Sequence, residues 1–174
     1  MKDVMIDLET LGTVPGCIIL SIGAVAFDPA SGQLGEEFYC VVNTESCKAA
    51  GLHEDQDTVD WWQKQNEEAK EVLLHADEGG LTLEEAMSKL TEYLEGIGIK
   101  SVRIWGNGAD FDNAILAACY KAAGQKTPWS PWNGRCYRTL KNLIKGPKLK
   151  REGTYHNALD DAKTQAKHAI QLLR

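Results

Sequence analysis

The sequence lacks the long apolar runs, repeats and low-complexity tracts that mark membrane, fibrous or disordered proteins. None of its apolar runs approaches the ~20 residues that a membrane-spanning helix needs. No basic stretch followed by an apolar one precedes Val4, so we expect a cytoplasmic protein that does not associate with membranes. A chain of 174 residues suits one sizeable core but is short for two, and we therefore predict a single domain over residues 1–174.

Cysteine is scarce and shows no pairing pattern. The five cysteines are odd in number and contain no Cys-x-x-Cys spacing: Cys17, Cys40, Cys47, Cys119 and Cys136. The sequence therefore gives no sign of a disulfide framework or a zinc site, and we expect reduced, mostly buried thiols. Basic residues are also outnumbered, which leaves a net charge of −6. This charge argues against a nucleic-acid partner unless the positive residues are concentrated in one place.

The chain begins with an apolar stretch that ends in two carboxylates. Residues 4–10 read Val-Met-Ile-Asp-Leu-Glu-Thr, which predicts a β-strand. Because side chains alternate between the faces of a strand, Asp7 and Glu9 project to one side and Val4, Ile6 and Leu8 to the other. Two carboxylates this close raise each other's pKa unless a cation lies between them, so the pair indicates a divalent-metal site. The alternative is a strand end that turns polar as it reaches water.

The segment up to residue 43 predicts an antiparallel β-meander. Residues 17–27 form a long apolar, β-branched run that is typical of a buried strand. Turn residues at 28–32 precede an alternating segment at 36–43, which we expect to pair back onto the second strand.

Two helices are expected next. From residue 55 the pattern becomes helical, with Asp57 and Thr58 as a candidate N-cap ahead of Trp61 and Trp62. Thr82 followed three residues later by glutamate is a capping box, and apolar residues then recur at helical spacing as far as Gly96 and Gly98.

The second half predicts βα units. Residues 102–106 form a short apolar strand, and a helix follows with one apolar face made of Phe111, Ile115, Ala118 and Ala122. Residues 125–134 are expected to be loop, and residues 135–149 to hold a short strand and a short helix. The last helix is expected over residues 158–173, capped by Asn157. A meander followed by βα units predicts an α/β domain built on one mixed sheet.

Two later segments could complete the acidic site. Asp112 lies in the first turn of the helix after residues 102–106, whereas we expect its neighbour Asp110 to cap that helix. His156 comes just before the last helix, and Asp160 fits the ordinary preference of acids for a helix start. Asp161 lies at the edge of an alanine stripe, so it faces the protein and needs a partner there.

These segments together resemble a known family. The order VMIDLET, NGADFD and HNALDD is similar to the three motifs of the DEDDh exonuclease superfamily, and it covers nearly the whole chain. The resemblance implies an α/β, ribonuclease-H-like fold with a mixed β-sheet flanked by helices. It also implies a 3′-to-5′ exonuclease, similar to compact single-domain bacteriophage and bacterial enzymes. By resemblance, the metal ligands are Asp7, Glu9, Asp112 and Asp161, and the catalytic histidine is His156.

The chemistry of such a site accounts for its residue types. Carboxylate ligands select hard cations, so two ions of Mg²⁺ or Mn²⁺ are expected, with Asp7 bridging them. They would polarise the scissile phosphate and neutralise the leaving 3′ oxygen, and the products would be nucleoside 5′-monophosphates. Neutral His156 would act as general base towards the attacking water. Taken alone, this histidine is better explained as a structural link between loop and helix, but beside three matched carboxylate positions the catalytic role is favoured.

A single-stranded RNA or DNA 3′ end is the expected partner. Seven of the nineteen basic residues lie between Arg135 and Arg151 without an acidic one, a strip that fits either a phosphate backbone or a solvated surface. We hypothesise that Trp61 or Trp62 stacks on terminal bases together with Phe111 and the family's wedge position at Leu11. The expected substrate contacts are Leu8, Thr10, Leu11, Trp61, Trp62, Asn107 and Phe111. Relatives in this superfamily are often dimers, so a homodimer is possible.

Two other functions compete with this interpretation. An aspartyl-phosphate phosphatase also places acids at the end of its first strand, but its second acid is aspartate, whereas this chain has Glu9. A catalytically silent nucleic-acid-binding or partner-binding module on the same fold is the other alternative, and the complete set of site residues gives no reason for silence.

Overall fold

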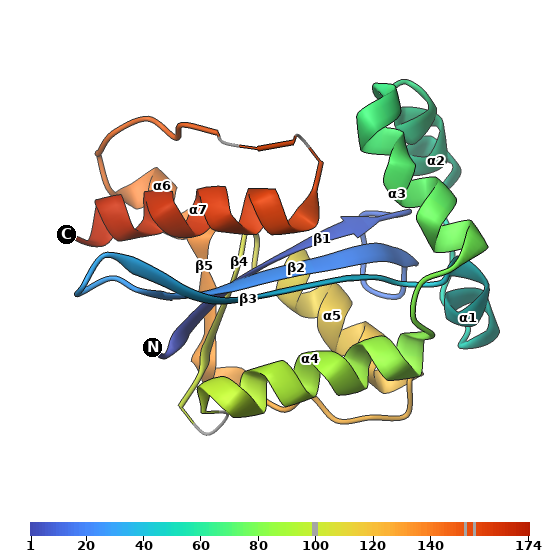
Figure 1. Ribbon diagram of the computed structural model, residues 1–174, viewed down its shortest axis with the longest axis horizontal. Helices are drawn as coiled ribbons and strands as arrows, with labels where there is room; N and C mark the ends of the chain where they lie inside the picture. The colour runs from blue at the N-terminus through green and yellow to red at the C-terminus, as the bar shows by residue number, and fades with distance from the viewer. Residues whose placement is uncertain (99–100, 152, 155) are drawn as a thin grey trace.

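The fold is a mixed five-stranded sheet with helices on both faces (Figure 1). The computed structural model describes residues 1–98, 101–151, 153–154 and 156–174. Within them the strands follow the order β3-β2-β1-β4-β5. Their bounds are β1 Asp3–Thr10, β2 Ile19–Asp28, β3 Gln33–Val41, β4 Arg103–Gly106 and β5 Gly134–Cys136. β1, β2 and β3 form an antiparallel meander, while β4 runs parallel to β1 and β5 parallel to β4.

The helices form two layers and an end group. Their bounds are α1 Thr44–Ala49, α2 Gln56–Gln63, α3 Glu67–Glu78, α4 Leu83–Ile97, α5 Asp112–Ala122, α6 Tyr137–Leu143 and α7 Ala158–Leu173. Figure 1 shows α7 along one face of the sheet, with α4 and α5 on the other. β1 ends and α7 begins at the same side of the molecule, where α2 and α3 are packed. No helix of the described residues is long and apolar enough to cross a membrane.

The alternation along β1 divides the core in two. Val4, Ile6 and Leu8 belong to the larger cluster, on the α4 and α5 side, and Met5 belongs to the smaller one beneath α7. Asp7 and Glu9 share the face of Met5, as the alternation of a strand requires. The sequence prediction for this strand is confirmed, and the two carboxylates lie on the α7 side of the sheet.

Close packing of α7 on the sheet depends on Gly23. This glycine pairs with Asp7 across the β1–β2 ladder. A Cβ atom at position 23 would overlap the backbone of Ala158 and Leu159, the first two residues of α7. Because glycine leaves this space free, the first turn of α7 rests directly beside the end of β1.

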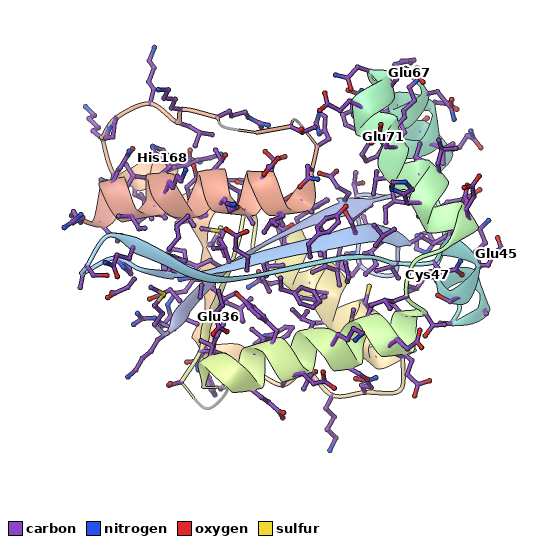
Figure 2. All side chains as sticks on the ribbon, viewed as in Figure 1. Glu36, Glu45, Cys47, Glu67, Glu71 and His168 are labelled. Carbon is purple, nitrogen blue, oxygen red and sulfur yellow. The ribbon has the colours of Figure 1, made fainter. Side chains whose placement is uncertain are left out.

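Most predicted elements are present, with shifted ends. β2 starts two residues later than expected, β3 starts earlier, and the predicted short elements after the 125–134 loop are β5 and α6, preceded by a 3₁₀ turn at Pro131–Asn133. The capping box of Thr82 and the Asn157 cap are both formed. The four cysteines Cys17, Cys40, Cys47 (Figure 2) and Cys119 are buried, Cys136 is partly exposed, and all are free.

Three local predictions are wrong. Asp55, not Asp57 or Thr58, caps α2, because Asp55 has an extended backbone and its side chain accepts from the Asp57 N–H. Asp110 does not cap α5: the helix starts at Asp112 after Phe111, which offers no capping side chain. The apolar face of α5 is also rotated from the predicted one, because its buried residues after the first turn are Ile115, Leu116, Cys119 and Tyr120.

Candidate active site

A cavity of about 580 Å³ opens where β1 ends and α7 begins. Its walls come from β1, the loop after it, α2, the β4–α5 turn, and the segment around the start of α7. The lining residues are Asp7, Leu8, Glu9, Thr10, Gly12, Thr13, Asp55, Asp57, Thr58, Trp61, Trp62, Asn107, Phe111, Arg151, His156, Asp161 and Gln165. Elements far apart in the sequence therefore meet in one hollow of the size used for small ligands.

Four carboxylates predicted from sequence converge at this cavity. Asp7, Glu9 and Asp161 line it. Asp112 lies just behind the wall, with 2% of its surface exposed, and its Oδ2 accepts from the Asn107 N–H at 2.7 Å. The glycine at position 106 makes this possible, because a Cβ atom there would press on Asp112.

Burial raises the pKa of each of these acids, and repulsion from the other acids adds to the rise for Asp7 and Glu9. The pKa of Asp7 lies well above its ordinary value, first because of burial and then because Asp112, Glu9 and Asp161 are close. Burial, with Asp161 and Asp112 nearby, raises the pKa of Glu9 to about 8. Burial raises the pKa of Asp112 to about 7 against the hydrogen bond from Asn107, and burial also raises that of Asp161. Because the cavity makes ionisation of four acids unfavourable, it favours a positively charged ligand that stabilises their ionised forms.

His156 joins the acids from the loop before α7. It is the only non-glycine residue of the described chain with a positive φ, at 60°, a strained backbone conformation that is common at functional sites. One ligand atom each of Glu9, His156 and Asp161 lie within 4.8 Å of one another. Burial lowers the pKa of His156, opposed by the nearby Asp161, and this shift favours the neutral imidazole.

The two tryptophans hold this imidazole from the side of α2. Trp61 and Trp62 both pack edge-on against the His156 ring, with centroids 5.0 and 6.1 Å away. Trp62 is 1% exposed and donates its indole N–H to the Thr10 carbonyl, whereas Trp61 is 40% exposed. As the sequence suggested, one ring belongs to the core and the other reaches the surface.

Leu11 does not fit its predicted role. Its side chain is buried in the core and lines a second hollow of about 440 Å³ on the other side of Trp62. The chain turns back after it, with the Leu11 N–H donating to the Ile18 carbonyl. A contact between Leu11 and a terminal base therefore does not agree with its position, while the other six expected contact residues line the cavity.

Two residues that hydrogen-bond the predicted acids were not themselves predicted as site residues. Gln165 donates to Asp7 Oδ1 at 2.6 Å, and Arg151 donates to Asp161 Oδ1 at 3.1 Å. Gln165 lies four residues after Asp161, which places both on one face of α7, so helical spacing contained this signal. For Arg151 the sequence indicates only membership of the basic strip.

Other residues of the basic strip differ in whether their side chains lie near the cavity. Lys141 on α6 donates to the Asn107 side chain at 3.3 Å, at the edge of the cavity. Arg135 instead turns back to the carbonyls of Trp132 and Gly134. His168 of α7 (Figure 2) bonds Tyr137 on α6 and the Pro147 carbonyl, which ties the segment after α6 to α7.

Comparisons with known proteins show the family and the fold of the chain. A family model described as a 3′-5′ exoribonuclease Rv2179c-like domain matches residues 2–173. The chain is 28% identical over 126 residues to an exodeoxyribonuclease of Enterobacteria phage T4, and the match covers 67% of this chain and 54% of the phage protein. The chain thus spans about half the length of this curated relative.

Solved structures share the fold. The nuclease domain of 3′hExo, a DEDDh family member bound to rAMP, superposes with a TM-score of 0.66 at 16% identity, over 98% of this chain and 90% of that one. A zinc-bound complex of E. coli Exonuclease I with single-stranded DNA gives a TM-score of 0.65 at 16% identity, over 97% of this chain and 40% of that one. The predicted ribonuclease-H-like fold class is confirmed.

Proposed function

The chain belongs to the Rv2179c-like 3′-5′ exoribonuclease domain family, and from this premise we propose that it removes nucleotides from the 3′ ends of single-stranded RNA or DNA. The observation that carries the proposal is the convergence of four acids and one neutral histidine at a single cavity. This set matches the three motifs of the DEDDh resemblance residue by residue. The proposed products are nucleoside 5′-monophosphates.

The donor set fits a pair of hard divalent cations. All four acids offer oxygen ligands, and Glu9, which is only 7% exposed, lines the cavity. Burial and the nearby Asp161 and Asp112 make ionised Glu9 unfavourable unless it is protonated or binds a cation. We assign Asp7, Glu9, Asp112 and Asp161 to Mg²⁺ or Mn²⁺. The bound ions would supply Lewis-acid polarisation of the scissile phosphate and neutralise charge on the leaving oxygen.

The protein's own residues would perform the remaining steps. Neutral His156 would take the proton of the attacking water, and the rings of Trp61 and Trp62 fix the direction of its imidazole. Gln165 would keep Asp7 oriented through its amide hydrogen bond. Phe111 and the exposed part of Trp61 offer aromatic surfaces in the cavity wall on which terminal bases can stack.

A nuclease assay with matched strands tests the proposal. RNA and DNA oligonucleotides of one sequence, labelled at the 5′ end, are incubated with Mg²⁺ or Mn²⁺. We expect progressive shortening from the 3′ end, release of 5′-monophosphates, and loss of both with EDTA or with Asp7→Asn. Binding without shortening would instead indicate a silent module, and hydrolysis of small phosphomonoesters alone would indicate a phosphatase.

The two aspartates of the second motif provide an internal control. Asp112 is buried behind the cavity wall, whereas Asp110 is exposed and does not line the cavity. Asp112→Asn is expected to abolish shortening, and Asp110→Asn to retain it. Loss of activity in Asp110→Asn alone would reassign the metal ligand. Size-exclusion chromatography with light scattering tests the possible homodimer separately.

A further inference from the structure

Arg151 is the one lysine or arginine among the described residues that line the cavity. Five carboxylates share the same walls: Asp7, Glu9, Asp55, Asp57 and Asp161. Arg151 donates from Nη1 to Asp161 Oδ1 at 3.1 Å, and the two side chains are 43% and 15% exposed. A partly exposed guanidinium thus lies on a carboxylate that the proposed function gives to a metal ion.

The backbone on either side of Arg151 is anchored. On the N-terminal side, the Pro147 carbonyl bonds His168 Nε2 at 2.8 Å. On the C-terminal side, Thr154 donates its N–H to Asp160 at 2.9 Å and its hydroxyl to Glu68 at 2.9 Å. These bonds connect Pro147 to α7 and Thr154 to α7 and α3, so Arg151 lies between two anchored residues and its long side chain lines the cavity.

Resting on the exonuclease function above, we propose that Arg151 is a ligand for the phosphate of the substrate's terminal nucleotide, and that in the metal-free protein it occupies Asp161 in competition with the divalent ion. Oδ1 of Asp161 cannot bind the guanidinium and a divalent cation equally well at the same time, because the two positive groups compete for the same lone pairs and repel each other. Displaced from Asp161, the planar fork of an arginine matches the oxygens of a phosphate. A phosphodiester entering among five acids meets a positive side chain here.

The proposal predicts opposite effects of one substitution on two affinities. Arg151→Ala should bind Mn²⁺ about threefold or more tightly in the absence of nucleotide, since a partly exposed ion pair is a modest competitor. In saturating Mn²⁺ the same variant should bind adenosine 5′-monophosphate about tenfold more weakly, since a charge-assisted hydrogen bond is lost. Adenosine, which lacks the phosphate, should bind wild type and variant alike. Arg151→Lys should retain part of the phosphate affinity because it keeps the charge but not the fork.

The affinities are measured by electron paramagnetic resonance of free Mn²⁺ and by isothermal titration calorimetry on the whole chain. Lys121→Ala is the matched control, because it removes the same charge from an exposed position on α5 away from the cavity. Both affinities should be unchanged in this control, and thermal melts verify that each variant folds.

Each refuting result is distinguishable from failure of the proposed function. Unchanged or weaker Mn²⁺ binding by Arg151→Ala would overturn the competition, and unchanged affinity for adenosine 5′-monophosphate would overturn the phosphate contact. A wild-type protein that trims single strands but shows either result refutes only the role of Arg151. A wild-type protein that binds no Mn²⁺ refutes the metal-dependent function itself.

Discussion

The substitution Glu9→Gln should abolish nuclease activity and yet stabilise the metal-free protein at alkaline pH. Burial raises the pKa of Glu9 from 4.5 to about 8 in the folded state. The folded protein therefore holds this proton more tightly than the unfolded chain does. Ionisation of Glu9 costs folding free energy, and the cost is absent below pH 4.5, grows as the pH rises, and is complete above about pH 8.

The magnitude follows from the same pKa. A rise from 4.5 to about 8 corresponds to at most about 5 kcal/mol of folding free energy at pH 9. The repulsion is shared with Asp112 and Asp161, which can take up protons in its place, so we expect glutamine to recover about 1–3 kcal/mol. For a domain of this length the melting temperature should rise by roughly 3–10 °C.

Thermal unfolding in EDTA at pH 5, 7 and 9 measures the effect. The gain of Glu9→Gln over wild type should be smallest at pH 5 and largest at pH 9. Glu36→Gln is the control, because Glu36 is exposed on β3 (Figure 2) and should show no such trend. Mg²⁺ at 100 times its dissociation constant should stabilise wild type at pH 9 by about 2.7 kcal/mol. The variant, which lacks one proposed ligand, should be stabilised less. A variant no more stable than wild type at pH 9, or a gain that is equal at all pH values, would refute the reasoning.

Three further substitutions test the packing of α7, the buried hydrogen bonds of Asp3 and the role of His156. Gly23→Ala should lower the free energy of unfolding in urea by about 3 kcal/mol or more, because the added methyl group overlaps the start of α7. A loss of less than about 1 kcal/mol, the low end of overpacking costs, would contradict this. Asp3→Ala should cost about 3 kcal/mol, because it leaves Arg103 and the Trp105 indole N–H without their buried acceptor, whereas an unchanged urea midpoint would contradict it. His156→Asn should lower kcat by about 10²–10⁴-fold while Mn²⁺ binding persists. In wild type the acid limb of the pH–rate profile should fall below pH 6.5, because burial lowers the pKa of His156; a limb unaffected by the substitution would exclude this histidine as the base.

Local sequence patterns predicted much of the site because they are short-range. The alternation along β1 placed Asp7 and Glu9 on one face, and the Asn157 cap fixed where α7 begins and hence where Asp161 lies. The same reasoning failed where more than one residue could cap a helix. Asp55, Asp57 and Asp110 are all plausible caps from their spacing, and only the path of the chain decides between them.

The sequence by itself determined the fold class, a mixed α/β domain, together with the acids, the histidine and the elements that carry them. What only the tertiary structure decided was which side chains touch across long separations. Gln165 bonds Asp7, Arg151 bonds Asp161, and Leu11 is withdrawn into the core. The physical reason is that strand and helix periodicity specify the direction of a side chain within its own element, whereas the distance between two elements depends on packing, here on the space left by one glycine beneath α7.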